Sequence, residues 1–118
     1  MPNAILYHNP RCSKSREAKA FVEQHIDNLQ VIEYLKHPLS KQELEALYNK
    51  MDLQSAHQML RPKEDEYKLA KLSETSSNDE VFEAIANYPK LLERPILEYG
   101  DKAAIGRPLD HIISLLHA

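Results

Sequence analysis

The sequence predicts an α/β fold, and three features of the residue order support this class. An apolar run at 4–8, a helical segment at 16–25 and a second apolar run at 29–35 form a βαβ unit. A helical stretch follows at about 40–90, and the end of the chain reads as two strands and a helix. We expect a single domain, 1–118, because chains of this length usually fold around one core.

The βαβ unit is predicted from local signals. The run at 4–8 has the length and apolar content of a buried strand, and Pro10 ends it because proline lacks a backbone donor. Ser13 or Ser15 can cap the next helix, which is predicted from Arg16 to about His25. The strands on either side of this helix should be parallel, with a right-handed crossover.

The middle helices are predicted from two capping boxes, in which a serine and a glutamate three residues later satisfy each other's free amides. These boxes lie at 40–43 and 77–80, and each precedes apolar residues at helical spacing. Two shorter helices are expected between them, at 55–60 and near 66–72.

The end of the chain is predicted to form a β-hairpin and a helix. Apolar runs at 95–99 and 103–105 flank Gly100-Asp101, whose residues suit a turn. Pro108 fits the first position of the last helix, where its missing amide costs nothing. Four apolar residues then face the core: Leu109, Ile112, Ile113 and Leu116.

Composition and charge exclude several classes of protein. Hydrophobic residues make up 42% and charged residues 28%, and no apolar run approaches the ~20 residues of a membrane span. A net charge of −3 argues against a general nucleic-acid binder. The single cysteine excludes an intrachain disulfide and favours the reducing cytoplasm. His25, His37, His57, His111 and His117 lack metal-ligand spacing with a cysteine or with one another, so we expect no metal. We also expect no bound cofactor and a monomer.

Cys12 is predicted to be a reactive thiolate, because it follows the first strand and lies at or just before a helix start. The free amides and the helix dipole there favour the charged form. A charged His8 would lower the thiol pKa further, and Ser15 can bond the thiolate or cap the helix. The alternative, a buried structural cysteine, is disfavoured by the basic neighbours, which are Arg11, Lys14 and Arg16.

The residues that follow Cys12 argue against two classes of cysteine chemistry. A dithiol motif needs a second cysteine three residues later, where Ser15 stands. A cysteine phosphatase loop needs an arginine six residues later, where Ala18 stands. The remaining interpretation is a single thiolate in a loop suited to oxyanions, which needs an external thiol to complete any redox cycle.

Four patches of the sequence carry a resemblance to a known family. They are the run YHNPRCSKSR at 7–16, Leu60-Arg61, Glu93-Arg94-Pro95-Ile96 and Ile105-Gly106-Arg107-Pro108. In order and spacing they resemble the compact branch of the glutaredoxin-coupled, ArsC-like arsenate reductases. The resemblance implies a thioredoxin-like fold with a helical insertion and a mixed four-stranded sheet. Such folds carry a cis proline where Arg94-Pro95 stands, although the sequence does not show the isomer.

The resemblance also implies roles for individual residues. Cys12 matches the nucleophile, and Arg61, Arg94 and Arg107 match anion-binding arginines for arsenate or a similar oxyanion. Guanidinium groups suit this task because they donate bidentate hydrogen bonds. For any one arginine taken alone, a surface ion pair is the favoured interpretation, and only the family match favours anion binding. The residues that would activate the nucleophile or shape its loop are His8, Ser15 and Arg16.

The implied reaction is reduction of arsenate to arsenite through a covalent arsenic–sulfur adduct on Cys12. Glutathione would be the external reductant, and glutaredoxin would resolve the mixed disulfide because the chain has no second cysteine. One alternative is an enzyme of the same chemistry that acts on a glutathione-linked substrate. Another is an Spx-like regulator that binds RNA polymerase, but its redox-sensing members carry C-x-x-C where Ser15 stands here.

Overall fold

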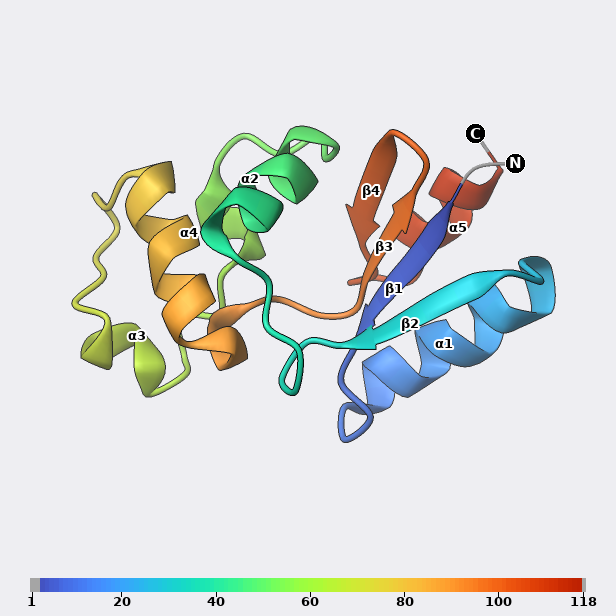
Figure 1. Ribbon diagram of the computed structural model, residues 1–118, viewed down its shortest axis with the longest axis horizontal. Helices are drawn as coiled ribbons and strands as arrows, with labels where there is room; N and C mark the ends of the chain where they lie inside the picture. The colour runs from blue at the N-terminus through green and yellow to red at the C-terminus, as the bar shows by residue number, and fades with distance from the viewer. Residues whose placement is uncertain (1–2, 118) are drawn as a thin grey trace. The chain divides into compact units, whose positions relative to one another are not determined.

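The computed structural model describes residues 3–117; residues 1, 2 and 118 of the predicted domain lie outside this range. The chain divides into two compact units. One contains the residues up to His37 together with those from Arg94 onward, and the other is Pro38–Glu93. The predicted α/β class and its element order are confirmed (Figure 1). The assignment of the whole chain to one domain stays a prediction.

The first unit is built on a mixed four-stranded sheet with the strand order β2-β1-β3-β4. β1 (Ala4–His8) pairs in parallel with β2 (Leu29–Glu33), as predicted. β3 (Ile96–Tyr99) is antiparallel both to β1 and to β4 (Lys102–Ile105). The predicted turn between β3 and β4 is confirmed, and Gly100 has a φ of 64°, a value that glycine adopts without steric cost.

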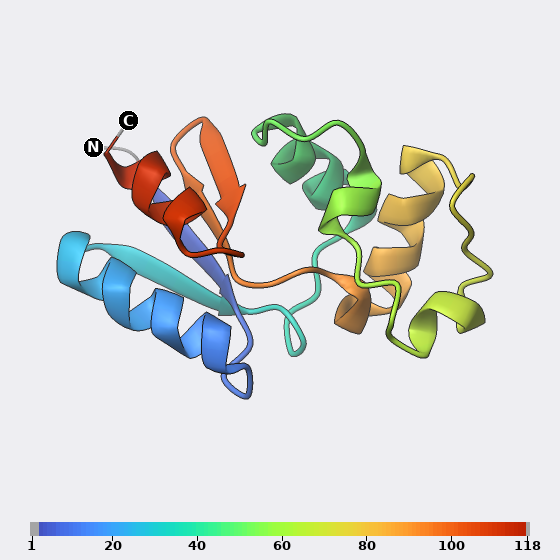
Figure 2. The ribbon, with the colours of Figure 1, turned by 180° about the vertical axis from the view of Figure 1, so that it is seen from behind.

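Two helices cover one face of this sheet, α1 (Ser13–His25) and α5 (Asp110–Leu116), as Figure 2 shows. Leu6 of β1 lies opposite Leu97 of β3, and both side chains are fully buried against these helices. The helices contribute Ala18, Val22 and Ile112 to the same core. Burying a large aliphatic side chain of this kind stabilises the fold by about 1.5–3 kcal/mol, which ties both helices to the sheet.

The start of α1 differs from the prediction. The helix begins at Ser13 rather than at Arg16, and Cys12 is its N-cap residue. Neither predicted serine caps the helix: Ser13 is its first residue, and Ser15 is buried within the first turn. Serine was favoured as a cap because its hydroxyl can accept from a free helix amide, but the Ser15 hydroxyl is engaged with the end of β1 instead.

Two further elements of this unit, α5 and β2, have boundaries that differ from the prediction. α5 begins at Asp110, so Pro108 precedes the helix instead of occupying its first position. Its carbonyl still accepts a hydrogen bond from the amide of His111, within the turn that leads into the helix. β2 ends at Glu33, two residues early, because the amides of Lys36 and His37 turn back to the Glu33 carbonyl.

The second unit is helical, as predicted for this segment. Both capping boxes are confirmed, at the starts of α2 (Lys41–Asn49) and α4 (Asn78–Asn87). The helix predicted near 66–72 is a single turn, α3 (Glu66–Leu69), and Lys71 follows it with a φ of 58°. Two 3₁₀ helices complete the unit, η1 (Ala56–Met59), where a short helix was predicted, and η2 (Pro89–Leu91). No helix within residues 3–117 is long and apolar enough to cross a membrane.

Candidate functional site

Cys12 lies between the end of β1 and the first turn of α1. Its extended backbone (φ −92°, ψ 123°) is that of an N-cap residue. The Cys12 amide donates to the Asn9 carbonyl at 3.1 Å, and the Cys12 carbonyl accepts from the amide of Arg16 at 3.0 Å. These bonds close the loop and leave the partly exposed thiol beside the free amides of the helix start.

The pKa of the Cys12 thiol is lowered from its ordinary value. Partial burial has the largest single influence and raises the pKa, but hydrogen bonds to the charged sulfur outweigh it. The donors are the backbone amide of Ser15, the guanidinium of Arg94, whose charge acts in the same direction, and the backbone amide of Lys14. The direction is the one that the sequence predicted, and it favours the nucleophilic thiolate.

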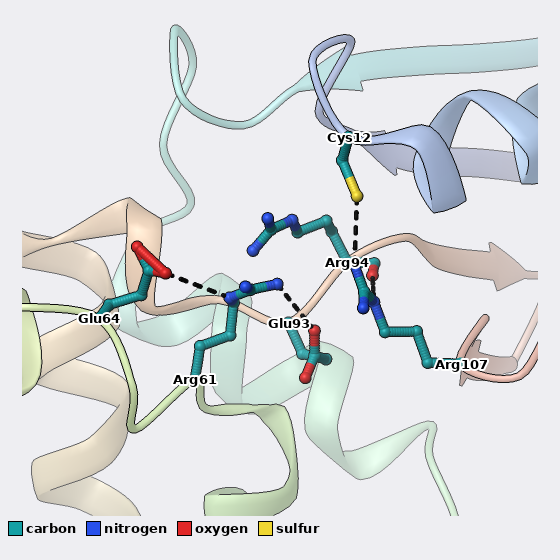
Figure 3. A network of polar contacts seen from close by, with 6 residues as sticks. All are labelled: Cys12, Arg61, Glu64, Glu93, Arg94 and Arg107. Carbon is teal, nitrogen blue, oxygen red and sulfur yellow. Dashed lines mark hydrogen bonds and ion pairs between the residues drawn. The ribbon is translucent and has the colours of Figure 1, made fainter.

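Arg107 contacts the same sulfur. Its Nη2 donates a hydrogen bond to Cys12 Sγ at 3.1 Å, drawn as a dashed line in Figure 3. Its Nε donates to the carbonyl of Arg94 at 2.6 Å, which ties the two arginines together. The structure therefore brings two of the three sequence-predicted arginines to the predicted nucleophile. The bonds Arg94-Pro95 and Arg107-Pro108 are both cis.

Gly106 keeps the Arg107 segment close to the Pro95 segment. Its amide donates to the carbonyl of Pro95 at 2.8 Å. A Cβ atom at Gly106 would lie 2.5 Å from Ile112 Cδ1 and 3.0 Å from Pro95 Cγ, distances at which packed atoms overlap. Sequence reasoning assigned no role to this glycine, because the crowding comes from residues that only the fold brings to it.

The pKa of His8 is lowered from its ordinary value, which disfavours the charged ring that the predicted activation of the thiol requires. Burial has the largest effect and lowers its pKa, the charge of Lys19 lowers it further, and Glu33 and Glu23 raise it by less. A lowered pKa favours the neutral form of the imidazole at pH 7. The ring is 5% exposed, and its Nδ1 lies 2.7 Å from Ser15 Oγ.

Ser15 joins the end of β1 to the start of α1. Its hydroxyl bonds His8 and also accepts a hydrogen bond from the amide of Asn9 at 3.0 Å. The Ser15 contribution to the thiol comes from its backbone amide. Arg16 is exposed, and its Nη1 donates to the carbonyl of Pro10 at 3.0 Å. Its guanidinium is thereby hydrogen-bonded to the loop backbone.

Arg61 lies in the second unit. Leu60 and Leu92 form an antiparallel bridge, and the amide of Arg61 donates to the carbonyl of Leu91 at 2.8 Å. The Arg61 guanidinium bonds Glu93 at 3.4 Å and forms an ion pair with Glu64 at 3.6 Å (Figure 3). Sequence reasoning missed both carboxylates as partners. The anion-binding role of Arg61 stays a prediction.

The model of the ArsC family matches residues 7–115 of this sequence. The chain belongs to the ArsC family. This ArsC-family chain is 44% identical over 117 residues to a protein of Neisseria meningitidis named arsenate reductase, covering 98% of the present chain and 100% of the relative. An arsenate reductase of Haemophilus influenzae is 39% identical over 115 residues, with coverage of 97% and 99%.

A solved structure in the same comparison supports the fold. The arsenate reductase from Vibrio cholerae matches this ArsC-family chain with a TM-score of 0.88 at 42% identity, covering 96% of this chain and 97% of that one. The predicted thioredoxin-like fold with a mixed four-stranded sheet is thereby confirmed. The family resemblance inferred from the four sequence patches is confirmed as well.

Proposed function

We propose that this ArsC-family protein is an arsenate reductase that uses glutathione and glutaredoxin as its thiol partners. The observation that carries the proposal is the contact between Cys12 and Arg107, in which a thiol of lowered pKa accepts a guanidinium hydrogen bond at 3.1 Å. A thiolate beside arginine donors can attack a tetrahedral oxyanion. The names of the Neisseria, Haemophilus and Vibrio relatives favour arsenate as that oxyanion.

In the first step, the Cys12 thiolate attacks the arsenic atom of arsenate. A sulfur–arsenic bond forms, an arsenic–oxygen bond breaks, and the oxygen leaves as hydroxide that takes up a proton to become water. The thiolate and the arsenate repel each other, because both are anions. The guanidinium groups of Arg94 and Arg107 lie at the sulfur and offset this repulsion.

In the second step, a glutathione thiolate attacks the sulfur of Cys12 in the adduct. A disulfide forms between Cys12 and glutathione, the sulfur–arsenic bond breaks, and its electron pair stays on arsenic, which is reduced from arsenate to arsenite. Glutaredoxin then attacks the glutathione sulfur and releases the Cys12 thiolate. An external resolving thiol is required because Cys12 is the single cysteine of the chain.

The test is arsenite release measured with glutathione and glutaredoxin, together and each omitted in turn. We expect turnover in the wild type when both thiols are present, and none in Cys12→Ser or Cys12→Ala. A glutathione mixed disulfide offered in place of arsenate serves as the competing substrate. Turnover that survives in both Cys12 variants would overturn the assignment of the nucleophile, and equal turnover without glutaredoxin would overturn its part in the cycle.

A further inference from the structure

A pocket of about 510 Å³ in the first unit is lined in part by Arg107, which is hydrogen-bonded to the Cys12 sulfur. It lies within the ~300–1,000 Å³ range of small-molecule sites. Two residues of α1, the segment between β4 and α5 and the first residue of α5 line it. Its charged residues are Lys14, Glu17, Arg107 and Asp110. All four are exposed, so a solute can reach them without any rearrangement of the core.

Two of the lining residues also touch the sulfur of Cys12. Arg107 donates its Nη2 hydrogen bond to Sγ while its side chain forms part of the pocket wall. Lys14 directs its backbone amide to the same thiol and also lines the pocket. A molecule held in this pocket therefore contacts two residues that are hydrogen-bonded to the Cys12 sulfur.

The charges of the pocket are balanced, with Lys14 and Arg107 against Glu17 and Asp110. Within residues 3–117, the side chains of Lys14, Glu17 and Asp110 form no ion pair with one another or with other residues. A hollow of about 430 Å³ on the other side of α1 differs, because its Lys19 and Glu23 already pair at 2.9 Å. The pocket beside Cys12 thus presents both signs of charge to a ligand.

This arrangement suits a zwitterionic peptide better than a simple anion. A small oxyanion gains little from a cavity in which carboxylates match the cations in number. Glutathione carries carboxylates at both ends and an ammonium beside one of them. Lys14 and Arg107 can bind its carboxylates, and Glu17 and Asp110 can bind its ammonium.

We propose that the pocket lined by Lys14, Glu17, Arg107 and Asp110 is the glutathione site, which presents the glutathione thiol to the sulfur of Cys12. The inference rests on the proposed function for the identity of the thiol reductant. Two subsites then meet at one sulfur and share Arg107: Arg94 and Arg107 receive the oxyanion, and Lys14, Glu17 and Asp110 hold the glutathione together with Arg107.

The probe is oxidised glutathione added to the reduced full-length protein, without arsenate. The Cys12 thiolate attacks one sulfur of the probe, a Cys12–glutathione disulfide forms, the original disulfide breaks, and one glutathione leaves as its thiolate. Mass spectrometry follows the adduct. Uncharged hydroxyethyl disulfide reacts with Cys12 in the same way but offers no charges to the pocket, so the ratio of the two rates removes any change in thiol reactivity.

We expect the rate with oxidised glutathione to saturate in the wild type. The rate ratio should fall about tenfold in Lys14→Ala and several-fold in Glu17→Ala, since each loses one charge-assisted hydrogen bond. Both side chains are exposed, so these variants keep the core. Lys102→Ala and Glu45→Ala remove exposed charges outside the pocket and should leave the ratio unchanged.

An unchanged ratio in both Lys14→Ala and Glu17→Ala would overturn the pocket assignment, whether or not arsenite is released. A reduced ratio in a protein that releases no arsenite would support the pocket while the proposed reductase function fails. The two proposals are therefore tested by separate readouts.

Discussion

Arg107 donates a hydrogen bond to the sulfur of Cys12 at 3.1 Å, although 95 positions separate the two residues in the sequence. The contact joins the loop after β1 to the segment after β4, and Arg107 also binds the carbonyl of Arg94. Cys12 thus has a cationic donor from one end of the chain and helix amides from the other.

Removing the Arg107 donor should raise the pKa of Cys12 and slow the proposed reaction. In Arg107→Ala, the midpoint of iodoacetamide reactivity against pH should move upward, because the thiolate loses a charge-assisted hydrogen bond. The kcat/KM for arsenite release should fall roughly 100-fold, as for the loss of one preorganised donor. Arg107→Lys keeps a positive charge and should therefore raise the midpoint less than Arg107→Ala does. Lys102→Ala should not move the midpoint. A midpoint in Arg107→Ala equal to that of the wild type would contradict the role.

His8 should stabilise the fold without controlling the thiol charge. His8→Ala should lower the free energy of unfolding at pH 7.5 by about 1–3 kcal/mol, because the buried hydrogen bond with Ser15 is lost. The pH midpoint of Cys12 alkylation should stay close to that of the wild type, since a neutral imidazole has no charge to remove. A large upward shift of that midpoint in His8→Ala would show that the ring is charged in the folded protein.

The lowered pKa of His8 also predicts a pH dependence of stability. As the pH falls, the ring of the folded state stays neutral at pH values where the unfolded chain already binds a proton. The contribution of His8 to the free energy of unfolding is therefore complete above the unfolded pKa of ~6.5. It is lost as the pH falls through the lower pKa of the folded state. Between pH 7.5 and 5.5, the free energy of unfolding measured with urea should therefore fall more in the wild type than in His8→Gln. Equal losses would contradict the assignment.

Gly106→Ala should destabilise the protein and disturb the site together. The new Cβ would lie 2.5 Å from Ile112 Cδ1, and overpacking of this kind costs about 1–3 kcal/mol. The double variant Gly106→Ala/Ile112→Val removes the nearest atom and should recover part of the loss, which chemical unfolding measures as a coupling energy. Strictly additive effects of the two substitutions would show that this contact is not the cause.

Arg61→Ala tests the anion-binding role that the family resemblance predicts. Sulfate should protect Cys12 from alkylation in the wild type and protect it less in Arg61→Ala, if this arginine binds the oxyanion. Lys63→Ala removes an exposed positive charge two positions away and should leave the protection intact. Unchanged protection combined with a loss of stability would restrict Arg61 to its contacts with Glu64 and Glu93.

Capping should contribute measurably to the helical unit. Ser77 Oγ accepts from the amide of Glu80 at 3.1 Å, and the Glu80 carboxylate accepts from the amide of Ser77 at 2.9 Å. Ser77→Ala should lower the free energy of unfolding by about 1 kcal/mol, while Ser114→Ala on the exposed side of α5 should change it little. Equal effects of the two substitutions would contradict the capping role.

Features that depend on neighbouring residues could be predicted from the sequence. The strand at 4–8, the capping boxes and the place of Cys12 at a helix start all follow from spacing within a few positions, where backbone geometry limits the alternatives. The family resemblance pointed to Arg94 and Arg107 without any knowledge of distance. Local reasoning offered Ser13 or Ser15 as the helix cap, whereas in the fold the Ser15 hydroxyl has a buried partner in His8.

Contacts between residues that are far apart in the sequence depend on the tertiary structure. It placed Arg107 at the sulfur of Cys12 and buried His8, which lowers the pKa of that ring when its position in the sequence suggested a cation. The strength of a hydrogen bond falls steeply when its donor–acceptor distance grows by a fraction of an ångström. The desolvation of a charged group depends on all the atoms around it. The separation of two residues in the sequence specifies neither the length of a hydrogen bond nor the degree of burial. The lowered pKa of His8 and the donor to Cys12 therefore follow only from the packing of β1, β4 and α1.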